Sequence, residues 1–120
     1  MLKNIVLIKH PKNWGLKESL VGRMAKRVLK KKNLRLVELS VVFVGRKKAK
    51  DLNIKYRQKD YVPQVLGFPM SKVADEDGMI RLGDIVICTQ KLKFEAKFQN
   101  KTTEMILNDW IEHGVDNLLM

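Results

Sequence analysis

The sequence has few of the residues that mark the common enzyme sites and exported proteins. Its 120 residues include one cysteine, Cys88, which cannot form an internal disulfide and therefore agrees with a reducing compartment. There are two histidines, and no CxxC pair, HExxH motif or phosphate-binding glycine-rich loop is present. The apolar stretch Leu2–Ile8 is short, whereas a membrane span needs roughly 20 apolar residues. We therefore expect a cytoplasmic protein with no membrane partner.

Acidic side chains are scarce in the N-terminal half. Lys and Arg total 24 against 13 Asp and Glu, which gives a formal net charge of +11. Residues 1–60 carry 18 basic and 4 acidic side chains, whereas residues 61–120 carry 6 and 9. Positive charge concentrated in one half suits a polyanion, because each neutralised phosphate releases condensed counterions. The asymmetry favours nucleic acid over the alternative of a merely solubilising surface.

Apolar periodicity predicts alternating strands and helices over the whole chain. The predicted strands are Leu2–Ile8, Leu36–Gly45, Val65–Phe68 and Ile80–Cys88. The predicted helices run from Leu16 to about Lys32, from Arg46 to about Tyr56, from Gln90 to Phe98 with Thr89 as cap, and onward from Thr102 as cap. This order indicates an α+β fold in which a small mixed sheet of about four strands packs against helices within a single domain, 1–120. Cys88, at the end of a buried strand, is expected in the core.

The first predicted helix has one apolar face and one basic face. Cations in its last turn suit the negative end of the helix dipole, which explains part of the cluster without a ligand. The remaining positive side chains form the expected electrostatic footprint for RNA. These predicted RNA-binding residues are Arg23, Lys26, Arg27 and Lys30.

The last predicted helix places a histidine beside its apolar stripe. That stripe consists of Leu107, Trp110, Ile111, Val115 and Leu118. His113 lies off the stripe, on a face shared with Asp109, Asp116 and Asn117. Three interpretations are open: a polar residue on a helix flank, a pair between His113 and Asp109, or a weak site for a hard cation.

Four segments in order carry a family resemblance. They are Leu52–Asp60 (LNIKYRQKD), Val65–Pro69 (VLGFP), Gly83–Cys88 (GDIVIC) and His113-Gly114. Together they resemble the YbeY family of bacterial endoribonucleases, whose pattern is LNxxYRxxD, TDVLSFP, GDIVI and HGxLHLxGYDH. The resemblance implies a YbeY-like fold and a single-strand-specific, metal-dependent endoribonuclease of ribosomal RNA maturation and ribosome biogenesis. It also implies zinc as cofactor, with ribosomal RNA and the small ribosomal subunit as partners.

The resemblance assigns roles to two residues. His113 matches the first zinc ligand, and Arg57 matches an arginine that serves the reaction and contacts RNA. A guanidinium there would orient a phosphate and stabilise charge on its oxygens. From the residues alone, the alternative for Arg57 is a surface salt bridge to Asp60.

The sequence also departs from the family pattern. Asn117 stands where the second histidine belongs, and the sequence ends at Met120, before a third could occur. The TDVLSFP block reads PQVLGFP (63–69), without its Thr, Asp and Ser. Three hypotheses follow: an active endoribonuclease, a non-catalytic RNA- or ribosome-binding relative, and a shortened inactive copy that lacks the family's C-terminal end.

Overall fold

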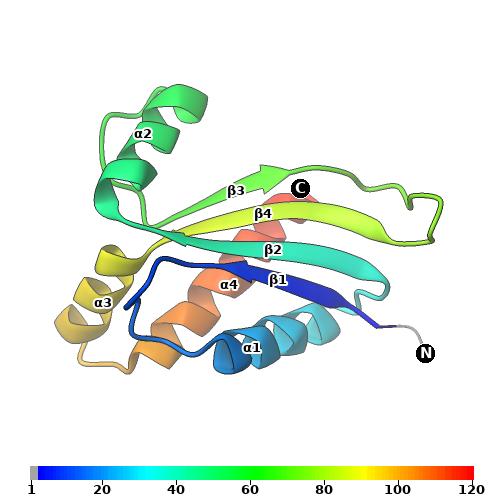
Figure 1. Ribbon diagram of the computed structural model, residues 1–120, viewed down its shortest axis with the longest axis horizontal. Helices are drawn as coiled ribbons and strands as arrows, with labels where there is room; N and C mark the ends of the chain where they lie inside the picture. The colour runs from blue at the N-terminus through cyan, green and yellow to red at the C-terminus, as the bar shows by residue number, and fades with distance from the viewer. Residues whose placement is uncertain (1–2) are drawn as a thin grey trace.

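The computed structural model describes residues 3–120, so Leu2 of the first predicted strand lies outside the described part (Figure 1). The strands are β1 (Ile5–Lys9), β2 (Val37–Val44), β3 (Val65–Pro69) and β4 (Ile80–Cys88). The helices are α1 (Glu18–Lys31), α2 (Arg46–Arg57), α3 (Thr89–Phe98) and α4 (Thr103–Leu119). The strand order is β1-β2-β4-β3, with β3 antiparallel to β4 and the other pairs parallel. This mixed sheet confirms the predicted α+β class.

Three helices cover one face of the sheet and leave the other open. α1 packs on β1, and α4 packs on β3 and β4 as well as on α1 and α3. α2 stands apart at one end, above the opposite face (Figure 1). In β2, buried and half-buried residues alternate, with Val37, Leu39, Val41 and Phe43 in the core as predicted. The sheet therefore has a covered face, a core beneath it, and an open face toward α2.

An extra residue in β4 changes which side chains reach the open face. Opposite β2, Arg81 pairs with Glu38 but Gly83 pairs with Leu39, so that Leu82 is the inserted residue of a bulge. Gly83 has φ of +134°, and a Cβ there would lie 2.1 Å from the carbonyl oxygen of Phe68. Only glycine fits this position. Without the insertion Asp84 would point into the core, because strand side chains alternate. With it, Asp84 reaches the open face.

The helix caps of the C-terminal half are partly as expected. Thr102 caps α4, since its hydroxyl oxygen accepts a hydrogen bond from the Met105 N–H at 3.2 Å. The prediction that Thr89 caps α3 is wrong. β4 runs directly into α3, so Cys88 occupies the cap position and Thr89 is the first helical residue. Cys88 is a buried free thiol in the core, as predicted. Within residues 3–120, no helix combines the length and apolarity needed to cross a membrane.

Candidate nucleic-acid interface

His113 lies on the exposed side of α4, the helix that passes beneath β3 and β4. The predicted apolar stripe of α4 is buried throughout. Gly114 permits close packing, because a Cβ there would lie 2.8 Å from Cδ1 of Ile85 on β4. The two residues of the His-Gly pair thus have separate surroundings. Gly114 faces the sheet, and His113 faces solvent.

Asn117 lies one turn after His113 and meets β3. A Cβ placed on Gly67 would lie 3.5 Å from Cβ of Asn117 and 3.8 Å from the carbonyl oxygen of Gly114. Gly67 and Asn117 are both positions at which the sequence departs from the YbeY pattern, where serine and histidine stand. The fold brings the two departures into contact. The surroundings of His113 therefore differ from the family pattern at two adjoining points.

The acidic residues of α4 serve contacts with α1. Lys31 donates to Glu112 and Lys32 pairs with Asp116, both at 2.6 Å. The hydrogen bond and charge of Glu112 raise the pKa of Lys31. No ion pair joins His113 to Asp109 within residues 3–120. The expected pairing of these two side chains is therefore absent from the described structure.

The donor set around His113 does not fit zinc. Structural and catalytic zinc sites take three or four His, Cys or carboxylate ligands. Across the described part of the chain, no three such side chains gather closely enough to hold a metal ion, which also excludes the predicted weak cation site there. The amide oxygen of Asn117 is a poor replacement for an imidazole. His113 remains one ligand position without partners among residues 3–120.

Arg57 is the last residue of α2, and the residues after it fix that end. Gln58 adopts a left-handed conformation, with φ of 56°, and its N–H bonds back to the last turn. The buried Asn53 donates from its amide to the carbonyl of Tyr61 at 3.0 Å and so holds the following loop. Asp60 pairs with Lys50 at 3.3 Å rather than with Arg57. The predicted alternative of an Arg57–Asp60 salt bridge is therefore wrong, and the exposed guanidinium has no ion pair within residues 3–120.

The structure does not bring Arg57 and His113 together. α2 lies over the open face of the sheet, where Leu52 and Tyr56 line a groove with Val42, and α4 lies beneath the covered face. No hydrogen bond links the two helices in the described part of the chain. A single catalytic centre built from Arg57 and His113 is not formed by the contacts present.

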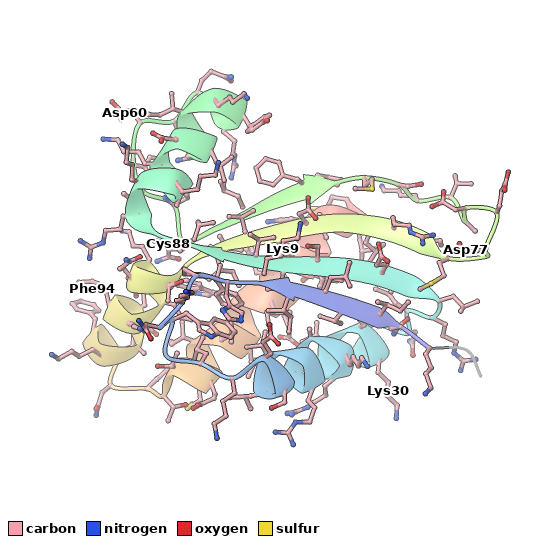
Figure 2. The ribbon with its side chains drawn as sticks, in the orientation of Figure 1. Lys9, Lys30, Asp60, Asp77, Cys88 and Phe94 are labelled. Carbon is pink, nitrogen blue, oxygen red and sulfur yellow. The ribbon has the colours of Figure 1, made fainter. Side chains whose placement is uncertain are left out.

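The basic face of α1 is exposed as predicted. Val21, Met24, Ala25, Val28 and Leu29 are buried in the core. The four predicted RNA-binding residues of this helix, Arg23, Lys26, Arg27 and Lys30, are all exposed. Figure 2 shows Lys30 pointing away from the sheet.

A groove of about 590 Å³ extends this basic face toward β1. Lys26 and Lys30 line one side, and Lys3 and Arg35 complete the lining charges, without any acid. Asn4 holds the segments together, since it donates to the carbonyl of Leu34 at 2.9 Å and accepts from the N–H of Val37 at 3.1 Å. Sequence reasoning missed Lys3 and Arg35. Their proximity depends on the parallel pairing of β1 and β2, which no local pattern reveals.

Comparison with known proteins identifies consistent relatives. The sequence profile of one family, described as Endoribonuclease YbeY, matches residues 9–119. A protein named Endoribonuclease YbeY from Thermodesulfovibrio yellowstonii is 40% identical over 88 residues, which is 73% of this chain and 55% of that protein. A protein of the same name from Wigglesworthia glossinidia brevipalpis is 39% identical over 87 residues, covering 72% of this chain and 52% of that protein.

Two further comparisons cover nearly the whole chain. Endoribonuclease YbeY from Aquifex aeolicus is 32% identical over 117 residues, or 98% of this chain and 76% of its own length. The solution structure of TM1509 from Thermotoga maritima superposes with a TM-score of 0.64 at 25% identity, covering 97% of this chain and 73% of that one. The chain spans about half the length of several curated relatives that it matches.

Proposed function

We propose that this chain, which belongs to the YbeY endoribonuclease family, acts on single-stranded ribosomal RNA during ribosome biogenesis. The observation that carries the proposal is the exposed, acid-free basic surface of α1 on a fold that matches the family over 9–119. Phosphates neutralised by such a surface supply the sequence-independent part of RNA affinity. Ribosomal RNA is accordingly the proposed substrate, and the small ribosomal subunit is the proposed setting.

Cleavage of single-stranded RNA is the proposed reaction, with Arg57 as the residue that contacts the scissile region. Its exposed guanidinium, free of the expected Asp60 pair, is able to bind a phosphate in two-pronged fashion. Charge that develops on the phosphate oxygens would be stabilised by the same group. The residues present do not fit the family's zinc, so no step of this proposal passes through a metal.

A second candidate function is RNA binding without cleavage. The contact between Gly67 and Asn117 favours it, because both departures from the family pattern adjoin His113. In this case the cytoplasmic protein would hold ribosomal RNA or the small subunit through α1 and α2 alone. Its basic face would be unchanged, and only the reaction would be lost.

A cleavage assay on the purified chain separates the two candidates. A labelled single-stranded ribosomal RNA fragment is incubated with the chain, with and without added zinc, and binding is measured in parallel by fluorescence anisotropy. Cleavage that Arg57→Ala abolishes, and that Arg57→Lys only partly restores, supports the endoribonuclease. Binding without cleavage in both conditions supports the second candidate. Absence of binding contradicts both.

A further inference from the structure

The open face of the sheet carries a pocket next to α2 that neither the basic surface nor His113 explains. The pocket measures about 370 Å³, within the range of small-molecule sites of about 300–1,000 Å³. Its lining is apolar and aromatic except for one carboxylate. The lining residues are Val42, Leu52, Tyr56, Phe68, Asp84 and Val86.

Two aromatic rings form one wall of this pocket. Tyr56 from α2 and Phe68 from β3 meet edge to face, with ring centroids 5.3 Å apart and planes inclined by 77°. Tyr56 is 54% exposed, so much of its ring is available to a partner. Aromatic side chains beside a positively charged groove are the usual platform on which single-stranded bases stack.

The carboxylate of Asp84 is the polar group of the pocket. Asp84 lies directly opposite Phe68 in the sheet, on the open face to which the Leu82 bulge turns it. It is half-buried between apolar neighbours and forms no ion pair or side-chain hydrogen bond within residues 3–120. A carboxylate partly removed from water without a partner is costly, and it is satisfied by a ligand that offers N–H donors.

The helix above the pocket supplies charge of the opposite sign. Of the twelve residues of α2, six are Lys or Arg and one is acidic. Lys55 lies 5.2 Å from the centroid of the Tyr56 ring, and Arg57 follows in sequence. A nucleotide has the complementary arrangement, with N–H donors on its base and negative charge on its phosphates.

We propose that this pocket binds one nucleobase of single-stranded RNA, and that Asp84 selects guanine. The inference rests on the proposed function and adds a base preference to it. Guanine stacks on Tyr56 and presents two adjacent donors, N1–H and the N2 amino group, to the two carboxylate oxygens. Adenine and cytosine present one amino group to a carboxylate, and uracil one ring N–H. The cations of α2 hold the flanking phosphates.

The test compares RNA dodecamers that differ at one base. Anisotropy is measured for a uridine dodecamer, for the same oligomer with one central guanosine, and for one with inosine, which lacks the N2 amino group. The guanosine oligomer should bind at least about fivefold more tightly than the inosine oligomer, because a hydrogen bond to a charged group is lost. Equal affinities for all three oligomers would overturn the inference, whereas the proposed function fails only if none of them binds.

Three variants and one spectrum locate the effect. Asp84→Asn should abolish the guanosine preference, and Tyr56→Ala should weaken all three oligomers by at least about fivefold. Tyr61→Ala is the matched control, since Tyr61 is also 54% exposed but lines a different groove. Guanosine 5′-monophosphate should shift the amide resonances of Phe68 and Asp84 in the wild-type chain, which avoids any dependence on variant folding. Shifts confined to other regions would contradict the assignment.

Discussion

Glycine at position 83 decides which residues of β4 face the pocket. Its φ of +134°, and the 2.1 Å that would separate a Cβ at this position from the Phe68 carbonyl oxygen, leave no room for another residue. The glycine of the GDIVI segment is thus required by the backbone of the bulge. Its role is to let the following aspartate reach the open face.

Gly83→Ala should therefore destabilise the chain by at least about 3 kcal/mol, since it combines backbone strain with a clash. Gly78→Ala is the matched control: Gly78 also has positive φ, at +85°, but nothing lies within 4 Å of its Cβ position. That control should cost about 1 kcal/mol. Urea unfolding of the two variants measures the difference, and equal losses would contradict the described bulge.

Asp77 ties the tip of the β3–β4 hairpin to Arg81, and Figure 2 shows it at the far end of that hairpin. Arg81 donates to both carboxylate oxygens, at 2.8 and 2.9 Å, and the Met79 N–H donates at 3.0 Å. The side-chain bonds from Arg81, followed by the Met79 bond, lower the pKa of Asp77 from 3.8 to about 2. The same contact raises the pKa of Arg81.

This lowered pKa predicts a pH-dependent contribution to stability. Because the folded pKa lies below the unfolded one, the contribution is fully present above about pH 4 and is lost as the pH falls toward 2. The difference in Tm between wild type and Asp77→Asn should accordingly shrink between pH 5 and pH 2. Glu76→Gln, which removes the adjacent exposed carboxylate, serves as control. A difference that stays constant over this range would exclude the Arg81 contact as its source.

At the scale of elements, α4 depends on its N-terminal cap. Thr102→Ala removes the 3.2 Å bond from the Met105 N–H and should cost about 1 kcal/mol of stability. Thr102→Ser keeps the hydroxyl oxygen and should cost much less. Chemical denaturation of both variants tests this, and similar losses for Ala and Ser would show that the hydroxyl is not the stabilising group.

Most element positions could be predicted from sequence because they depend on local periodicity. The alternation of β2 and the stripes of α1 and α4 are examples, and the Thr102 cap is another. The open-face position of Asp84 could not, because it depends on the bulge that β4 forms against β2. The Thr89 cap failed for a related reason: nothing in the local sequence shows that β4 continues into α3 without a turn.

The candidate site was predictable only where it follows a single helix. The cations of α1 were found from helical spacing, whereas Lys3 and Arg35 join them through strand pairing. The contact of Gly67 with Asn117 likewise joins segments far apart in sequence. Motif comparison identified both positions as departures from the family pattern. Their contact became visible only in the fold.

At the scale of the whole molecule, the basic groove and α2 lie at opposite ends of a body 40 Å long (Figure 1). Charge reversal at Lys26, Lys30 and Arg35 should weaken RNA binding and reduce its salt dependence by about 0.7 per lost phosphate contact. Reversal of Lys93, Lys97 and Lys101, outside that groove, gives a control with the same change of net charge. Anisotropy titrations compare the two triple variants, and equal losses would show that net charge alone, not the groove, sets the affinity.

The central claim is that this chain binds single-stranded RNA through its basic surface. The most direct test is the affinity of the wild-type chain for a labelled single-stranded ribosomal RNA fragment between 50 and 300 mM KCl. The account predicts that the logarithm of the association constant falls linearly with the logarithm of salt concentration, with a slope of about −2 or steeper, as several neutralised phosphates require. Absence of binding at 50 mM KCl, or an affinity that does not change with salt, would contradict it.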